Sequence, residues 1–459
     1  LSYCTAIGSG ALDGTGIRNN QMSTAVGMNA LGGSQGGTVG FNTAIGGNTM
    51  VGNMGAGDQG NYNTTVGYTG LYSLTTGNNN VAVGSGAGYD LTTGGSNVFV
   101  GYQAGDNAST TSNNVAIGYQ SLGAETGSLL TGGSTVAVGY QAFGVAEGGE
   151  GNGVAIGYRA GRNIGAAGIW IGYEAGMNIS GSAQAINIAI GAGAMRHLSD
   201  NDSQYNVAIG DQALEGNGLT GNVTGNIAIG YHALKVVTSA TSNVAIGGRS
   251  VLLALTTGDE NVAIGYGAGQ TATTTSDMVL IGSNAGNTLT GTGPDGSIAI
   301  GKGALATHTT GARNIAIGFE AMHDTNAGST AQGSSNNIFI GYDAAGGAWA
   351  DVASTHNVAI GSYTMNGVLS GATHNTALGD YAGKSITSGD DNVMVGSAAG
   401  DAITSGYRNV TIGRYAGSAI NTGVSNITIG YAAGDAMTDT TSTVLIGENA
   451  GGAINSTDA

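Results

Sequence analysis

Two kinds of side chain in this sequence could carry out chemistry if the fold brings them together. His356 and His374 each lie five residues before a glycine of a recurring pattern. If these segments lie side by side, the two imidazoles could share a metal ion or simply face solvent. A third ligand cannot be assigned, so the solvated edge is favoured over a metal site.

Paired carboxylates are the second possibility. Asp259 with Glu260, and Asp390 with Asp391, are neighbours in polar stretches. A glycosidase needs two carboxylates roughly 5 to 9.5 Å apart beside a groove. Acidic residues before a strand more often keep a surface soluble. The sequence therefore predicts no enzyme and no catalytic residues, with a polysaccharide depolymerase as the lesser alternative.

The glycine-rich stretch GSGAG, residues 84–88, partly imitates a dinucleotide-binding fingerprint. That fingerprint requires a following helix whose N-terminus holds the pyrophosphate, whereas here another turn and strand follow within a dozen residues. We expect no cofactor.

Tyrosine follows a recurring glycine in ten places. Such tyrosines stack if the segments lie side by side, and their exposed edges could contact a sugar ring. Stacking alone explains why tyrosine recurs at this position, so a structural role is favoured over a glycan-contacting surface. The candidate glycan-contacting residues are the tyrosines of five consecutive repeats, Tyr102, Tyr119, Tyr140, Tyr158 and Tyr173. The rival recognition site is the long loops of the repeats ending at Gly67, Gly139 and Gly341.

All these residues belong to one repeat. The pattern of NVAIGYGAG, residues 261–269, occurs in 25 copies, and the reference glycine, Gly265 in this copy, recurs most often after 17 residues. The residues one and three before it are Val, Ile, Leu or Thr in every copy. This two-residue alternation of branched side chains predicts a short strand of four or five residues. Such strands, returning with Asn, Thr and Gly between them, predict an all-β parallel solenoid of about 25 rungs, occupying residues 1–459 as a single domain.

Two further positions of the repeat predict its interior. Asn lies four before the reference glycine in 17 copies, which favours a hydrogen-bonded ladder between rungs. Ala lies three after it in 20 copies and is expected at a tight inward corner.

Composition excludes several functions. The formal net charge is −17, with 11 Lys and Arg against 28 Asp and Glu, which argues against nucleic-acid binding. The single cysteine, Cys4, excludes an intrachain disulfide. There is no apolar run long enough for a transmembrane helix.

The middle residue of each strand, two before the reference glycine, carries the prediction about partners. It is Ala in 16 copies and never charged. Strands apolar on both faces are buried on both faces. We expect Val262 and Ile264 to fill the solenoid and the middle residue to contact another chain, in a threefold or a twofold assembly. The predicted interface residues are Ala263, Phe99, Trp170, Leu280, Phe339 and Met394.

The repeats NVAIGYGAG, NIAIGYHAL (226–234) and NNVAIGYQSL (113–122) resemble the head repeats of trimeric autotransporter adhesins and similar repeats of bacteriophage tail fibres. The resemblance implies a left-handed β-roll, a homotrimeric fibre and attachment to a cell-surface glycan or protein receptor. The adhesin heads have shorter repeats, and the TTG turns (75–77, 92–94 and 256–258) are more similar to the phage form. We therefore expect an extracellular, non-enzymatic fibre of a virion, with a bacterial surface adhesin or filament as the alternative.

Overall fold

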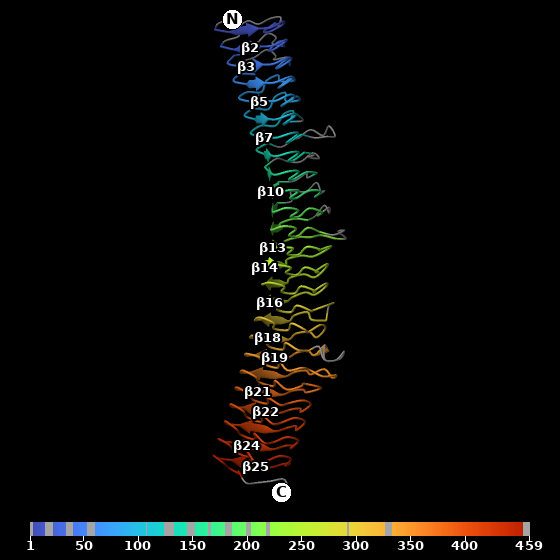
Figure 1. Cartoon of the computed structure of the whole chain (residues 1–459), viewed down its shortest axis with the longest axis vertical. Coiled ribbons are helices and arrows are strands. Elements are labelled where there is room, and N and C mark those ends of the chain that lie inside the picture. Colours follow the sequence, from blue (N-terminus) through green and yellow to red (C-terminus); the bar gives the residue numbers. More distant parts are fainter. Residues whose placement is uncertain are drawn as a thin grey trace. The chain divides into compact units, whose positions relative to one another are not determined.

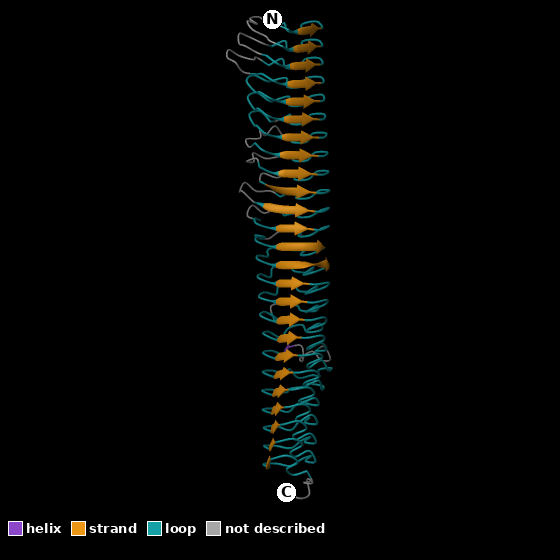
Figure 2. Ribbon diagram, turned by 90° about the vertical axis from the view of Figure 1, so that its left-hand side faces the viewer, coloured by secondary structure: helices purple, strands orange, loops and turns teal. Residues whose placement is uncertain are grey.

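The computed structural model describes residues 3–13, 22–33, 40–52, 60–106, 108–123, 133–144, 152–163, 167–179, 186–198, 203–216, 221–291, 293–325 and 333–452. These residues form two compact units, Leu1–Gly225 and Asn226–Ala459, which are built from the same rung. Each rung contains one strand, and within each unit consecutive strands lie side by side and point the same way (Figures 1 and 2). The expected all-β parallel solenoid is confirmed.

The first unit contains twelve described strands: β1 (Thr5–Ile7), β2 (Thr24–Val26), β3 (Thr43–Ile45), β4 (Thr64–Val66), β5 (Val81–Val83), β6 (Val98–Val100), β7 (Val115–Ile117), β8 (Val136–Val138), β9 (Val154–Ile156), β10 (Gly168–Ile171), β11 (Asn187–Ile190) and β12 (Val207–Ile209). The second contains thirteen: β13 (Ile227–Tyr231), β14 (Val244–Arg249), β15 (Val262–Ile264), β16 (Val279–Ile281), β17 (Ile298–Ile300), β18 (Ile315–Ile317), β19 (Ile338–Ile340), β20 (Val358–Ile360), β21 (Thr376–Leu378), β22 (Val393–Val395), β23 (Val410–Ile412), β24 (Ile427–Ile429) and β25 (Val444–Ile446). Most have three residues, fewer than the four or five expected.

Equivalent residues of the repeat stack in register. Between β15 and β16, for example, Ala263 pairs with Leu280 and Ile264 with Ile281. In every strand except β13 and β14, the strand ends just before the reference glycine, where the chain turns with a positive φ, +129° at Gly265. A Cβ at that position would lie 2.6 Å from the carbonyl oxygen of Gly282 in the next rung, so no other residue fits.

The asparagine ladder is confirmed. The Asn392 side chain shows its geometry: Nδ2 donates to Asn375 Oδ1 in the preceding rung and to the Gly406 carbonyl, both at 2.9 Å. Its Oδ1 accepts from the backbone N and the Nδ2 of Asn409, at 3.0 and 3.1 Å. These asparagines are fully buried, so the ladder satisfies polar groups that water does not reach.

The middle strand residues do not lie at an interface, which corrects the sequence interpretation. Ala263, Phe99, Trp170, Leu280, Phe339 and Met394 all have 0% exposure within the single chain. Together with the corner alanines, such as Ala268, they form the core of each unit. The alanine corner was predicted correctly, whereas the two faces of the strand were assigned the wrong way round.

The core is narrow, and this explains the preference for alanine in mid-strand. Most large middle residues stand where glycine, rather than Leu or Met, lies four residues after the reference glycine, although Phe339 has Met322 and Ala345 at this position. Phe99 packs against Gly88 and Gly105, where an added Cβ would lie 2.8 and 2.4 Å from its ring. Trp170 packs in the same way on Gly161 and Gly176.

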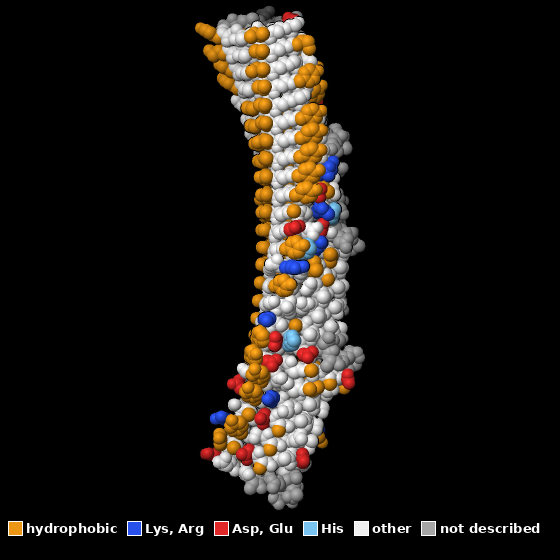
Figure 3. Space-filling model, viewed as in Figure 1, with side chains coloured by type: hydrophobic (Ala, Val, Ile, Leu, Met, Phe, Trp, Pro, Cys, Tyr) orange, Lys and Arg blue, Asp and Glu red, His pale blue; other side chains and the backbone are white. Residues whose placement is uncertain are grey.

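The branched residues of the strands instead form an exposed apolar surface. We call the residues one and three before the reference glycine the outer strand face. Its members are all Val, Ile, Leu or Thr in the described strands, and none is charged. Ile117, Ile156, Ile264 and Ile360 are 37–40% exposed, the rest of each being covered within the chain. Figure 3 shows apolar side chains gathered in narrow columns that follow the strand stack.

Candidate functional site

The five tyrosines singled out in the sequence form one continuous stack, which we call the tyrosine ladder. Ring centroids of successive members are 5.1–5.2 Å apart and their planes lie within 15° of parallel. Each ring follows the glycine that ends a strand, from β6 to β10. The separation is close to the spacing of about 4.8 Å between neighbouring strands, so each ring follows the register of its rung. The predicted stacking is confirmed.

The tyrosine ladder is exposed along its length, with fractions of 37–53% at its five members. A row of polar side chains runs beside it, one residue further along each rung: Gln103, Gln120, Gln141, Arg159 and Glu174. We call this the polar row. Its amides are linked, since Gln120 Nε2 donates to Gln103 Oε1 and Gln141 Nε2 to Gln120 Oε1, both at 3.1 Å.

Charged residues continue the polar row. Arg159 Nε donates to Gln141 Oε1 at 3.3 Å, while its guanidinium carbon lies 5.0 Å from the centroid of the Tyr158 ring. In the next rung, the last of the ladder, the Glu174 carboxylate raises the pKa of the Tyr173 hydroxyl, with smaller contributions from loss of solvent and from a hydrogen bond to Glu174. The phenol therefore stays protonated and able to donate at neutral pH.

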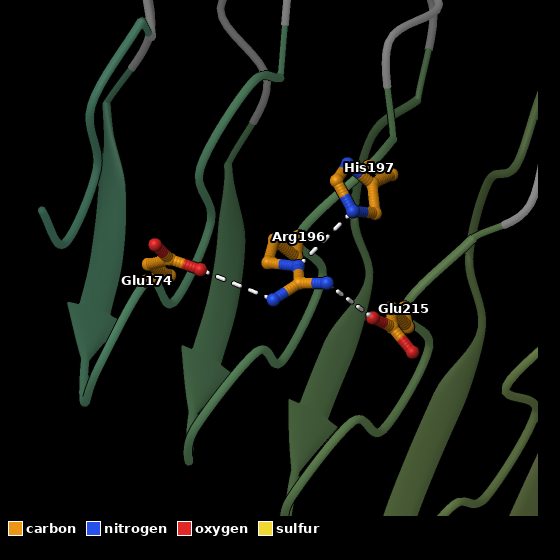
Figure 4. Close-up of polar contacts among 4 residues, drawn as sticks. All are labelled: Glu174, Arg196, His197 and Glu215. Carbon is orange, nitrogen blue, oxygen red and sulfur yellow. Dashed lines mark hydrogen bonds and ion pairs between the residues drawn. The ribbon is translucent and has the colours of Figure 1, made fainter.

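An ion-pair cluster follows the polar row (Figure 4). Arg196 lies between two carboxylates, with Nη1 3.1 Å from Glu174 Oε2 and Nη2 3.2 Å from Glu215 Oε1. Its Nε donates to His197 Nε2 at 3.0 Å, so this nitrogen of His197 is unprotonated. The carboxylates are only 11% and 9% exposed. The cluster links three rungs, and both of its carboxylates are paired with the Arg196 guanidinium.

The acidic pairs predicted as alternative catalytic groups have structural partners. Asp259 Oδ1 accepts hydrogen bonds from the backbone N and the hydroxyl of Thr241, at 2.6 and 2.9 Å. Asp390 Oδ1 accepts the same two bonds from Thr373, at 2.7 and 2.8 Å. In other rungs Asn61, Asn78 or Ser112 accepts a backbone N–H from the same position. The first carboxylate of each pair therefore holds neighbouring rungs together.

His356 and His374 lie on adjacent rungs, as expected. Their rings stack with centroids 5.0 Å apart and planes 6° from parallel, and both side chains are exposed. Within the described parts of the chain, no group of three or more His, Cys, Asp or Glu side chains could hold a metal ion. The two histidines therefore stack across adjacent rungs in the same way as the tyrosines do.

His308 was not singled out by its sequence pattern, yet it is the only histidine of the described residues that is completely buried. It stands where Leu289 stands in the preceding rung and Ile386 in a later one. Its Nε2 lies 2.9 Å from the Gly311 carbonyl and its Nδ1 3.3 Å from the Thr325 hydroxyl. A neutral ring with its proton on Nε2 satisfies both contacts.

We expect His308 to make folding pH-dependent. Burial lowers its pKa from 6.5 to about 4, an effect that the Gly311 hydrogen bond only partly offsets. Between these values only the unfolded chain takes up the proton, so stability is fully present above pH 6.5 and falls by about 3 kcal/mol on reaching pH 4. Hydrogen exchange around β17 at pH 7.5 and 4 measures this loss. His308→Leu should abolish this part of the pH dependence, and an unchanged dependence would contradict it.

Two other sequence features considered as candidate sites are the glycine-rich stretch at residues 84–88 and the long loops. Residues 84–88 form the turn that follows β5, and no helix follows before β6. The long loops proposed as a rival recognition site lie largely outside the described residues. No helix in the described portion is long and apolar enough to cross a bilayer.

The chain matches no protein-family model, and no curated protein is similar to it. The resemblance to adhesin heads and phage fibres therefore rests on the repeats alone.

Proposed function

We propose that the chain is a non-enzymatic structural fibre that assembles through its outer strand face and serves attachment at a cell surface. The observation that carries the proposal is the uncharged, mostly apolar outer strand face of each unit. Parallel sheets are rarely left uncovered on one side, and extended apolar patches mark interaction surfaces.

A second copy of the chain is the occupant that this face fits. Its two columns of branched side chains repeat once per rung, and another outer strand face has the same repeat and the same chemistry. Covering the exposed third of each side chain would contribute roughly 0.5–1 kcal/mol, so the twelve rungs of the first unit alone supply on the order of 10 kcal/mol. This sum exceeds the lower estimates of the cost of association.

A threefold arrangement covers the face best. The outer strand face is two side chains wide, and three such narrow stripes can converge on a common axis that runs along the strands' stacking direction. We therefore propose a homotrimer, located outside the cell on a virion tail fibre or on a bacterial surface. The structural partners of Asp259 and Asp390 give no support to a depolymerase.

The native mass of the purified chain, measured by light scattering, tests the assembly. We expect three chains, whereas a dimer would refute the threefold axis and a monomer the whole proposal. Charges of alternating sign on β15 to β18 (Ile264→Lys, Ile281→Glu, Ile300→Lys and Ile317→Glu) should weaken the assembly while pairing within one chain.

The same four rungs provide a matched control. Tyr266→Lys, Ser283→Glu and Phe319→Glu, with the native Lys302, place the same alternation on the residue after each reference glycine. This variant should keep the wild-type mass. Equal loss of mass in both variants would contradict a specific role of the outer strand face.

A further inference from the structure

The tyrosine ladder and the polar row form a surface separate from the outer strand face, on the other side of the reference glycine. We propose that this surface binds one chain of an extended β-1,4-linked polysaccharide, of the cellulose, chitin or mannan type, lying along the strands' stacking direction. The proposal deepens the attachment function and rests on it, since it names the class of receptor.

The spacing of the rings is the first argument. Successive tyrosines repeat at 5.1–5.2 Å over five rungs. An extended β-1,4-linked chain of pyranose rings advances by nearly the same length per sugar. Each sugar can therefore meet one tyrosine, and the match persists along the ladder. An α-1,4-linked chain curves into a helix and loses this match after a few rings.

The chemistry of the surface is the second argument. Pyranose rings present C–H groups that pack on aromatic carbon, and hydroxyl groups at their edges that need hydrogen-bonding partners. The tyrosines of the ladder are 37–53% exposed, so part of each residue is open to a ligand. Alongside it, Gln103, Gln120 and Arg159 of the polar row are partly exposed and offer amide and guanidinium groups, whereas Gln141 and Glu174 are buried.

The order of the polar row also suits a long, uncharged ligand. The amides of Gln103, Gln120 and Gln141 are fixed by bonds to one another, so little side-chain freedom is lost on binding. Only one cation and one anion, Arg159 and Glu174, stand in the row. With a net charge of −17, the chain would repel a polyanion, which favours a neutral polysaccharide.

Titration of the full-length chain with cello-oligosaccharides of two to six rings tests the proposal. We expect the affinity to rise with each added ring until the five tyrosines are spanned, and cellohexaose to bind at least about tenfold more tightly than maltohexaose. Chitohexaose and mannohexaose should show the same dependence on length. Failure of all three hexaoses to bind, or an affinity independent of length, would overturn the proposal.

Variants locate the surface. Tyr140→Ala, in the middle of the ladder, should weaken cellohexaose binding by about tenfold or more, as removal of a central aromatic anchor does. The control is Tyr266→Ala, because Tyr266 is 54% exposed and has Ser283 and Gly248 as its neighbours in the column. If the two substitutions reduced the affinity for cellohexaose equally, the tyrosine ladder would not be the binding surface.

The native mass separates the two proposals. A trimer that binds none of the hexaoses would leave the assembly intact and refute the polysaccharide surface. A monomer that binds cellohexaose through Tyr140 would support the polysaccharide surface and refute the assembly. Tyr140→Ala should retain the wild-type mass, which shows that its lost affinity does not come from unfolding.

Discussion

Replacing Asn392 with alanine is expected to lower the local free energy of unfolding around β22 by about 3–6 kcal/mol. The substitution removes all four side-chain hydrogen bonds of a fully buried residue. The backbone N–H of Asn409 and the carbonyl of Gly406 lose these partners where water cannot replace them. Each such group costs about 1–3 kcal/mol, and the shortened side chain leaves a cavity as well.

Hydrogen exchange of the amides in β21 to β23 is the suitable measurement, because each rung contacts only its neighbours and opens locally. Asn392→Ser is the matched control. Serine occupies the same position at Ser297, where its hydroxyl accepts from the backbone N of Asn314 at 3.2 Å. The serine variant should therefore lose less protection than the alanine variant. If the two variants lost the same protection, the stability of the ladder would not depend on the side-chain oxygen that accepts the backbone N–H of the next rung.

The repeat made the ladder and the strand stack predictable. Neighbouring strands pair in register, so an Asn that recurs at one position of the repeat lies next to the equivalent Asn of the next rung. The length of the repeat alone therefore identifies its partner. The same reasoning predicts the contacts of His356 with His374 and of Tyr140 with Tyr158. In each case the side chain and its partner occupy equivalent positions, so one period determines the contact.

The direction of the strand faces was not predictable from hydrophobicity, since both faces are apolar. Large branched residues suggested an interior, but they stack outside, and the narrow interior takes alanine. A second signal was present in the sequence: most large middle residues, though not Phe339, coincide with glycine four residues after the reference glycine. Leu280 has Gly269 and Gly286, and Met394 has Gly383 and Gly400. Such exchange of volume between two positions indicates that both face the same core.

Contacts that depart from the repeat could not be predicted. Arg196 lies five residues after its reference glycine, and Glu174 two residues after another, so no common position links them. His308 is polar where neighbouring rungs are apolar, and its burial depends on Thr325 and Gly311, which suit this one side chain. Features of this kind require coordinates because a period says nothing about single exceptions.

Ala263→Asp and Ile264→Asp, at adjacent residues of β15, should have opposite consequences. Ala263 is fully buried between Ala245 and Leu280 of the neighbouring strands. An aspartate there would place an unpaired carboxylate in a narrow apolar core, and we expect the local stability to fall by about 4 kcal/mol or more. Hydrogen exchange should show the loss of protection in β14 to β16.

Ile264→Asp tests the opposite face of the same strand. Its side chain is 37% exposed, so a carboxylate at this position can reach water in the single chain. We expect the amides of β14 to β16 to keep most of their protection and the native mass to become sensitive to concentration, because the charge interrupts the surface that a second copy would cover. The reverse result, with Ala263→Asp changing only the assembly and Ile264→Asp unfolding the rungs, would return the middle residues to the interface. The two substitutions introduce the same group one residue apart, so the difference between them reports only which way each side chain points.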